Sequence, residues 1–168
     1  SFKKKSSIIF LDLILIIALY SFYYMAEDNI ISQYLLFWSV LLVILSDVGG
    51  YVFGKTFKWK KITKISPNKT LSGVFGSFVF SLISIPIVHY VYATDKINFL
   101  DPKFLFLALF FSLVAQAGDL TISYYKRLEK IKDIGNILPG HGGILDRIDG
   151  AVFVIIISLI FYKLNLIP

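Results

Sequence analysis

The sequence contains no cysteine, and this absence excludes several kinds of chemistry. Without thiols, the chain has no disulfide framework, no thiolate metal site and no cysteine nucleophile. Redox chemistry is therefore not indicated, whereas the compartment stays open. The sequence also lacks an initiator methionine, because it begins at Ser1. We interpret this start as a processed product or as a fragment without the earlier helices.

Polar residues are too few for a soluble globular domain. Hydrophobic residues make up 57% of the 168 and the mean hydropathy is +0.75, which is typical of integral membrane proteins. Apolar stretches of about 20 residues, the length that crosses ~30 Å of hydrocarbon, run at roughly Ile8–Met25, Tyr34–Phe53, Leu71–Ala93, Phe104–Tyr125 and Gly150–Leu166. The predicted fold is an all-α integral membrane bundle of about five transmembrane helices, with residues 1–168 forming a single transmembrane domain.

Lysine and arginine are unevenly distributed along the chain. They fill the N-terminus and the loops at residues 54–70 and 126–149, and are nearly absent from residues 26–33. The positive-inside rule then predicts a cytoplasmic N-terminus and two cytoplasmic polar loops. Lysines in these loops are either topology signals or partners for anionic lipid headgroups, at about 1 kcal/mol each near the surface.

Three aspartates lie within the apolar stretches, where a carboxylate needs a polar or cationic partner. We interpret Asp12, beside the N-terminal lysines, as a helix-start carboxylate or a packing contact. Asp47 and Asp119 both occur late in helices that run toward the cytoplasm, so we expect them at similar depth, converging on one site. For Asp47, a hydrogen bond within the bundle is the alternative.

Polar residues follow one face of the fourth predicted helix. Asp119, Ser123 and Lys126 are spaced by four and three residues, which places them on one stripe. The stripe is consistent with a catalytic face. It is equally consistent with a bundle-facing stripe that contains an ion pair between Asp119 and Lys126.

A glycine-rich segment and two further aspartates follow that helix. The segment Pro139–Gly143 cannot form a regular helix, and its backbone could bind phosphate or form a simple turn. Within it, His141 is a candidate phosphate contact, proton donor or structural histidine. Asp146 and Asp149 share one face at the start of the fifth helix, where the macrodipole also favours acids. Together with Asp119 they form the oxygen-ligand set that Mg²⁺ prefers beside substrate phosphates.

Two segments carry a resemblance to a known family. Residues 119–149 resemble the signature of phosphatidate cytidylyltransferases, also called CDP-diacylglycerol synthases. The matching residues are Ser123, Lys126, Arg127, Lys132, Asp133, Gly135, Leu138, Pro139, His141, Gly142, Gly143, Asp146, Arg147 and Asp149. Residues 47–76, with SPNKT at Ser66–Thr70 followed by Gly73, resemble the family's earlier loop, which is written around S-P-K-K-T.

The resemblance implies a nucleotidyltransferase that transfers CMP from CTP to phosphatidic acid and releases CDP-diacylglycerol and pyrophosphate. It also implies Mg²⁺ and a second, monovalent cation such as K⁺. The implied catalytic residues are Asp119, Lys126, Asp146 and Asp149, with Asp119, Asp146 and Asp149 as metal ligands. The implied substrate-binding residues are Ser66, Lys69, Thr70, Ser123, Arg127, Lys132, His141, Gly142, Gly143 and Arg147, and Asp47 completes the polar pocket.

The chain departs from the family pattern at two acidic positions. Ile122 and Ser72 stand where members often carry glutamate. The family also has additional N-terminal membrane helices, so the chain is expected to be the C-terminal catalytic part of that fold.

Other functions have less support in the sequence. A polyprenol or phytol kinase is the nearest alternative in chemistry, and a small membrane transporter is the non-enzymatic one. The D-G-x-x-A-R pattern of CDP-alcohol phosphatidyltransferases is absent. We expect a bacterial inner membrane, an active site facing the cytoplasm and no nucleic-acid partner. The pair Gly50 and Gly54 is suited to close helix packing, either within the bundle or in a homodimer.

Overall fold

The computed structural model describes residues 2–63, 66, 69–92, 98, 101–128 and 145–167, without the side chains of residues 2–8 and 145–147. The described chain forms five helices: α1 (Phe2–Glu27), α2 (Ile30–Phe57), α3 (Leu71–Val91), α4 (Pro102–Leu128) and α5 (Leu145–Lys163). Between them, the described residues contain one isolated antiparallel bridge, from Lys61 to Thr70. The predicted all-α fold is confirmed.

Four of the described helices, α1 to α4, are long and apolar enough to cross a membrane. The protein is therefore an integral membrane protein. The helices α1, α2 and α4 and the start of α5 extend beyond the predicted apolar stretches, because helical hydrogen bonding continues into polar flanks that hydropathy does not mark. Thus α4 runs on to Leu128, and α5 begins at Leu145 instead of Gly150. In contrast, α3 and α5 end earlier than predicted, at Val91 and Lys163.

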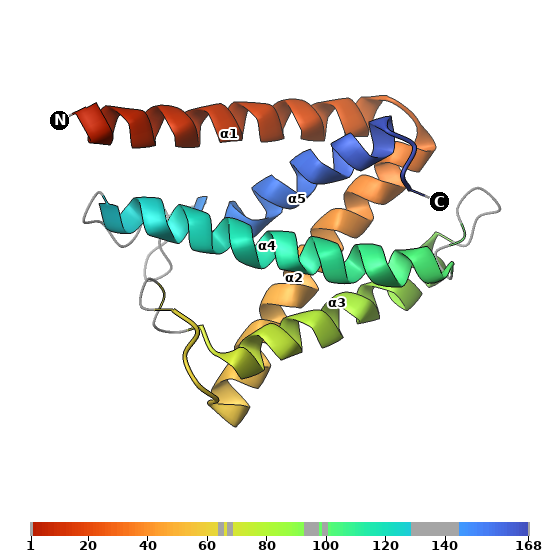
Figure 1. Ribbon diagram of the computed structural model, residues 1–168. Coiled ribbons are helices and arrows are strands. Elements are labelled where there is room, and N and C mark those ends of the chain that lie inside the picture. The colour runs from red at the N-terminus through yellow and green to blue at the C-terminus, as the bar shows by residue number, and fades with distance from the viewer. Residues whose placement is uncertain are drawn as a thin grey trace.

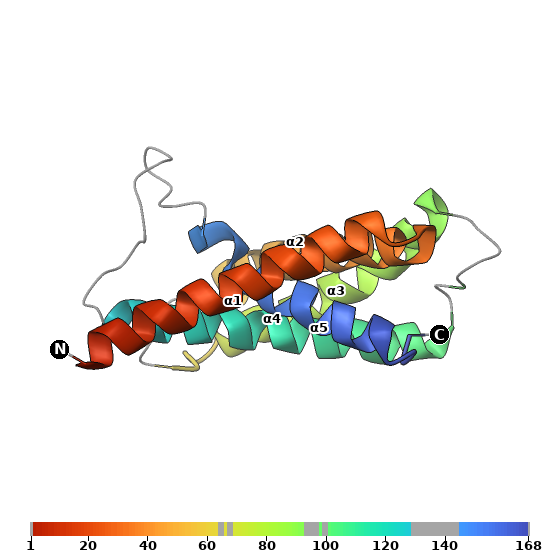
Figure 2. The same cartoon turned by 90° about the horizontal axis from the view of Figure 1, so that it is seen from above.

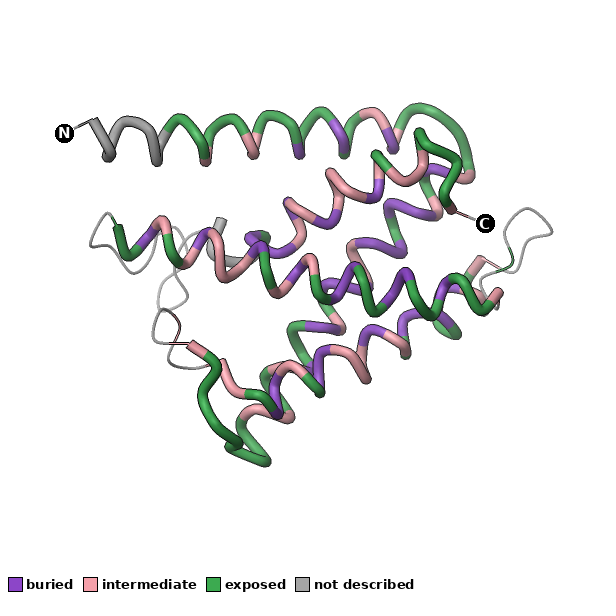
Figure 3. The backbone as a smooth tube through the Cα atoms, viewed as in Figure 1, coloured by how far each residue is buried: buried purple, intermediate pink, exposed green. Residues whose placement is uncertain are grey.

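The helices form one bundle with α1 on its outside. Figure 1 shows the axes of α1 and α4 nearly parallel but with opposite chain directions, whereas α2 crosses behind α4 obliquely. In both Figure 1 and Figure 2 the N-terminus, the C-terminal end of α4 and the start of α5 lie toward the same end. Burial is concentrated where α2 to α5 face one another, while most described residues of α1 are exposed, as Figure 3 shows.

Aromatic and small polar side chains fill the interior together. The indole of Trp38 on α2 is fully buried, and its Nε1 donates to Ser84 Oγ on α3 at 2.9 Å. The ring of Phe104 on α4 meets Trp38 edge-on, with centroids 5.2 Å apart. Ser39 donates to Ser158 Oγ on α5 at 2.9 Å. Such hydrogen bonds between helices replace the hydrophobic driving force that is missing between apolar helices in lipid.

A second polar cluster joins the first helices to the last one. Tyr162 on α5 donates its hydroxyl to Asp28 Oδ2 at 2.7 Å and also contacts the Asn29 side chain. The ammonium of Lys163 lies 3.8 Å from the ring centroid of Tyr24 and also contacts its hydroxyl. The turn between α1 and α2 is therefore attached to the C-terminal end of α5.

Glycines let α2 and α3 approach more closely than any residue with a side chain would allow. A Cβ atom built on Gly49 would lie 2.3 Å from the carbonyl oxygen of Gly76, and one on Gly76 would lie 2.4 Å from that of Gly49. Gly50 and Gly54 face Ser77 and Thr70 respectively. The close packing expected for Gly50 and Gly54 is therefore between helices of one chain.

We predict that Gly49→Ala and Gly76→Ala each lower the free energy of unfolding by about 1–3 kcal/mol, because the added methyl group would press on backbone atoms. Thermal unfolding of the purified protein in detergent measures this change. Gly54→Ala is the matched control, since its Cβ would meet the Thr70 hydroxyl at 3.2 Å and the Gly73 Cα atom at an ordinary contact distance of 3.7 Å. Equal stability of Gly49→Ala and the unmodified protein would contradict the close contact.

Candidate active site

A polar cavity of about 280 Å³ lies between α2, the start of α3 and α4, and we call it the central pocket. Its walls combine two carboxylates, one lysine, hydroxyl groups and two glycines. The lining residues are Asp47, Gly50, Tyr51, Ser66, Lys69, Thr70, Gly73, Val74, Ser77, Gln116 and Asp119. The convergence predicted for Asp47 and Asp119 is confirmed, because both line this pocket.

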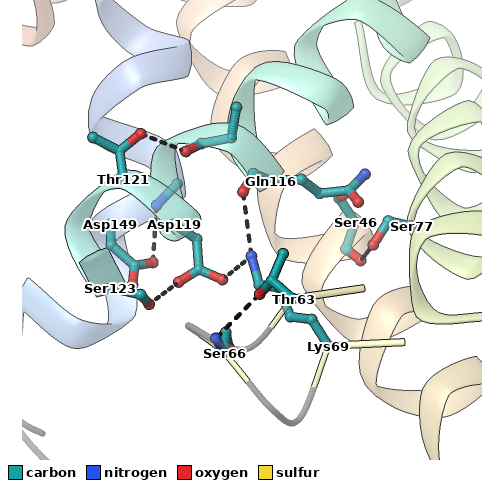
Figure 4. A network of polar contacts seen from close by, with 12 residues as sticks. Ser46, Thr63, Ser66, Lys69, Ser77, Gln116, Asp119, Thr121, Ser123 and Asp149 are labelled. Carbon is teal, nitrogen blue, oxygen red and sulfur yellow. Dashed lines mark hydrogen bonds and ion pairs between the residues drawn. The ribbon is translucent and has the colours of Figure 1, made fainter. Parts of the chain in front are cut away.

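Lys69 reaches across the central pocket from the α2–α3 loop to α4. Its ammonium forms an ion pair with Asp119 and donates to the backbone carbonyl oxygen of Gln116 at 3.2 Å. Figure 4 shows the side chain of Lys69 pointing at both partners. The same lysine interacts electrostatically with Asp47 on α2. One cation therefore joins the two polar segments of the chain.

The backbone around Lys69 is held by a short antiparallel pairing. The amide of Ile62 donates to the carbonyl oxygen of Lys69 at 3.0 Å. The amide of Leu71 donates to the carbonyl oxygen of Lys60 at the same distance, 3.0 Å. Directly after it, Thr70 caps α3 by accepting from the amide of Gly73 at 3.1 Å. A threonine N-cap satisfies a helical amide that would otherwise lack a partner. The cap and the pairing together direct Lys69 into the pocket.

Asp119 is also the link to α5. Ser123, one turn further along α4, donates to Asp119 Oδ1 at 3.2 Å. The carboxyl of Asp149 on α5 lies close enough to Asp119 for the two side chains to interact, and Figure 4 shows them side by side. Asp149 also accepts from the amide of Gly150 at 2.9 Å.

Lys126 supplies a second cation, next to Asp149. Its Nζ lies 4.0 Å from Asp149 Oδ2, and both residues are only 8% exposed. A buried ammonium needs such partners, because desolvation of an isolated charge is costly. Arg127, the next residue, is exposed on the last turn of α4.

The described site therefore contains three carboxylates, Asp47, Asp119 and Asp149, and two lysines offset their charge. Asp119 interacts electrostatically with Asp47 on one side and with Asp149 on the other. Among the residues that the structure describes, no group of three or more acidic, histidine or cysteine side chains is spaced to hold a metal ion alone. The side chain of Asp146, at the start of α5, lies outside that description.

The structure thus brings together part of the predicted site. The central pocket is lined by five of the predicted residues: Asp47, Ser66, Lys69, Thr70 and Asp119. Ser123 contacts Asp119 outside this lining, and Lys126 lies next to Asp149. The predicted residues Lys132, His141, Gly142 and Gly143, and the side chains of Asp146 and Arg147, lie outside the described residues. Their roles stay predictions.

Sequence reasoning missed Gln116, Ser77 and Ser112. Gln116 lines the pocket and its backbone accepts from Lys69, while its side chain donates to Ser112 Oγ at 3.3 Å. Asp119, Ser123 and Lys126 are spaced by four and three residues. The same kind of spacing continues backward along α4, by three residues to Gln116 and by four more to Ser112. Following the polar stripe in that direction would have identified both residues on α4. Ser77, on α3, gives no comparable signal.

The two positions that depart from the family pattern are both buried. Ser72 lies in the first turn of α3, where its hydroxyl is 3.0 Å from Thr70 Oγ1 and also accepts from the amide of Trp59 at 3.4 Å. Ile122 is 2% exposed on α4. Ser72 is satisfied by hydrogen bonds and Ile122 by apolar packing. Neither side chain is charged, so neither needs a cation within the bundle.

The fold and the site define an integral membrane bundle with a polar cavity that combines two carboxylates with a lysine. Residues 1–165 match the model of the cytidylyltransferase family, and the chain belongs to this family. It is 42% identical over 135 residues to a phosphatidate cytidylyltransferase of Staphylococcus haemolyticus, covering 80% of this chain and 50% of the relative. It is 40% identical over 137 residues to a protein of the same name from Bacillus subtilis, covering 79% of this chain and 50% of the relative. The chain therefore spans about half the length of the curated relatives it matches.

We predict that Asp119→Asn increases amide hydrogen exchange at Lys69 and Ile62, because the loop loses its ion pair to α4. A partly exposed ion pair of about 1 kcal/mol allows an increase of up to about fivefold. Hydrogen exchange with mass spectrometry measures it. Asp149→Asn is the matched control, since it leaves the Lys69 ion pair in place, and equal exchange in the two variants would contradict the link.

Proposed function

We propose that this chain carries the site that transfers CMP from CTP to phosphatidic acid, forming CDP-diacylglycerol and pyrophosphate. The observation that supports this most directly is the ion pair between Lys69 and Asp119. It joins the two sequence segments that resemble the family's signature loops, so both segments contribute to one pocket. Family membership and the names of the relatives favour this transfer over a lipid-alcohol kinase or a transporter.

In the proposed reaction, a phosphate oxygen of phosphatidic acid attacks the α-phosphorus of CTP. The new phosphorus–oxygen bond forms as the bond to the β-phosphate oxygen breaks, and pyrophosphate leaves in line with the attack. Charge on the phosphates is offset by lysines such as Lys69 and Lys126, because positioning and electrostatic stabilisation supply most of the catalysis in such transfers. No covalent enzyme intermediate is needed.

The acids around Asp119 fit a divalent cation. Carboxylates that lie side by side in a partly buried site repel one another unless a proton or a cation is placed between them. We propose that Asp119 and Asp149, with Asp146, hold Mg²⁺, which would neutralise phosphate charge when bound. A second, monovalent cation such as K⁺ is part of the same proposal.

The proposed substrates also fit the membrane setting. A lipid phosphate stays at the membrane surface, whereas CTP arrives from the aqueous side, so the pocket must open where the two meet. The basic loops at residues 54–70 and 126–149 are expected in the cytoplasm by the positive-inside rule. We therefore propose a cytoplasmic active site in a bacterial inner membrane.

We predict that Asp119→Asn, Asp146→Asn and Asp149→Asn each lower CDP-diacylglycerol formation by about 100-fold or more, the cost of losing electrostatic stabilisation at the reacting phosphates. Radiolabelled CTP and phosphatidic acid in detergent measure the product. The control is Asp12→Asn, which removes an exposed intramembrane acid that does not line the pocket. Full activity of all three variants would contradict the metal assignment, and no CTP-dependent product from the folded, unmodified protein would contradict the function.

Loss of the Lys69 ammonium should have opposite effects on two quantities: it should strengthen the binding of a divalent cation and weaken the binding of the nucleotide. Its ammonium pairs with Asp119, so it competes with a divalent cation, yet it is placed to bind phosphate. We predict that Lys69→Met strengthens Mn²⁺ binding to the nucleotide-free protein, measured by electron paramagnetic resonance, and raises the KM for CTP about 10-fold or more. Lys69→Arg keeps the charge and should change both quantities less. Weaker Mn²⁺ binding by Lys69→Met would contradict the competition.

A further inference from the structure

A second cavity, of about 540 Å³, opens beside the central pocket at the C-terminal end of α2. We call it the basic groove. Its lining residues are Gly50, Tyr51, Gly54, Lys55, Lys58, Trp59, Lys61 and Thr70. Gly50, Tyr51 and Thr70 also line the central pocket, so the two cavities share one wall. Nothing in the proposed transfer has used this groove.

Three lysines give the basic groove its charge. Lys58 ends α2 in the left-handed conformation, with φ of 51°, which turns the chain so that Lys55, Lys58 and Lys61 all border the same cavity. Lys55 donates to the Tyr51 hydroxyl at 3.3 Å and its Nζ lies 5.5 Å from that ring. Among the described residues, no carboxylate pairs with these three lysines. The groove is therefore suited to an anion.

Apolar surface lies directly beside those charges. Tyr51 and Trp59, which line the groove, are 67% and 55% exposed. Phe57 and Phe75 are also exposed, and the rings of Phe53, Phe57 and Trp59 follow one another at centroid distances of 5.3 and 6.3 Å. A free phosphate ion would use only the lysines. A molecule with an anionic head and an apolar tail would use both surfaces.

The basic groove lies at the side of the bundle. Because α2 crosses the bundle obliquely, Figure 1 shows its C-terminal end at the lower edge of the bundle, away from the C-terminal end of α4 at the left. The exposed residues at this edge are visible in Figure 3. Tryptophan, tyrosine and lysine side chains are typical of the membrane–water interface. A lipid in the surrounding bilayer could enter the groove sideways.

We propose that the basic groove binds the acceptor lipid, a lipid with a phosphate monoester head, before the head enters the central pocket. Lys55, Lys58 and Lys61 bind the phosphate, and Tyr51 and Trp59 contact the glycerol and the first part of the acyl chains. The proposal rests on the proposed function, because it is the shared wall that lets the head reach the nucleotide. It assigns a role to lysines that topology alone does not require.

Trp59 offers a direct probe of this binding. The chain has two tryptophans, and Trp38 is fully buried. Phosphatidic acid with brominated acyl chains, titrated into the protein in phosphatidylcholine nanodiscs, should quench the Trp59 fluorescence at a lower mole fraction than brominated phosphatidylcholine does. Trp59→Phe should remove that difference. Inorganic phosphate should neither quench the signal nor displace the lipid at equal concentration.

The lysines are tested with a matched pair of variants. The double variant Lys58→Gln, Lys61→Gln should raise the phosphatidic acid concentration for half-maximal quenching about 10- to 30-fold, since each lysine near the surface contributes about 1 kcal/mol. Lys60→Gln is the control, because Lys60 is exposed on the same loop and does not line the groove. It should leave the titration unchanged.

Three results would overturn the proposal, two from the quenching titrations and one from competition with inorganic phosphate. The first is equal quenching by phosphatidic acid and phosphatidylcholine, and the second is an equal effect of Lys60→Gln and the double variant, which would indicate general surface charge. The third is displacement of the lipid by inorganic phosphate, which would assign the groove to a free anion instead. Fluorescence is independent of turnover, so a groove that binds lipid in a protein without CMP transfer would contradict the proposed function and leave the lipid site standing.

Discussion

The backbone contact between α2 and α3 at Gly49 and Gly76 determines where the polar residues of this protein lie. Since neither glycine has a side chain, the two helices meet at their backbones, and Gly50 and Gly73 become walls of the central pocket. The loop between the helices must then turn back over a short distance. That turn brings Lys69 to α4, where its ammonium forms the ion pair with Asp119.

Charge balance explains how acids and lysines coexist within an apolar bundle. Each described carboxylate in the site has a cation or a hydrogen-bond donor nearby. Lys69 serves Asp119 and Asp47, and Lys126 and the Gly150 amide serve Asp149. The ion pair between Lys69 and Asp119 is partly exposed, so it contributes little free energy and is easily rearranged. A phosphate group entering the pocket can therefore exchange partners with the protein at small cost.

Hydropathy and charge patterns predicted much of this architecture. Alternating spans place Asp47 and Asp119 on the same side, so their meeting in one pocket follows from topology. The choice of partner for Asp119 could not be predicted, since spacing along α4 suggested Lys126 and said nothing about a lysine from a distant loop. Helix crossing angles are equally invisible in the sequence, and so is the left-handed conformation of Lys58. These features depend on packing between segments far apart in the chain, which is why the basic groove had no counterpart among the sequence predictions.

The cluster of Tyr24, Asp28, Tyr162 and Lys163 has a consequence for biogenesis. It attaches α1 and the start of α2 to the end of α5, which is synthesised after the other described helices. Most described residues of α1 face outward, and its packing within the bundle is mainly against α5. The α1 helix must therefore stay in the bilayer, in contact with lipid or the insertion machinery, until α5 is synthesised. Closure of this end of the bundle is a late step of assembly, and the early helices carry their interaction surface exposed until then.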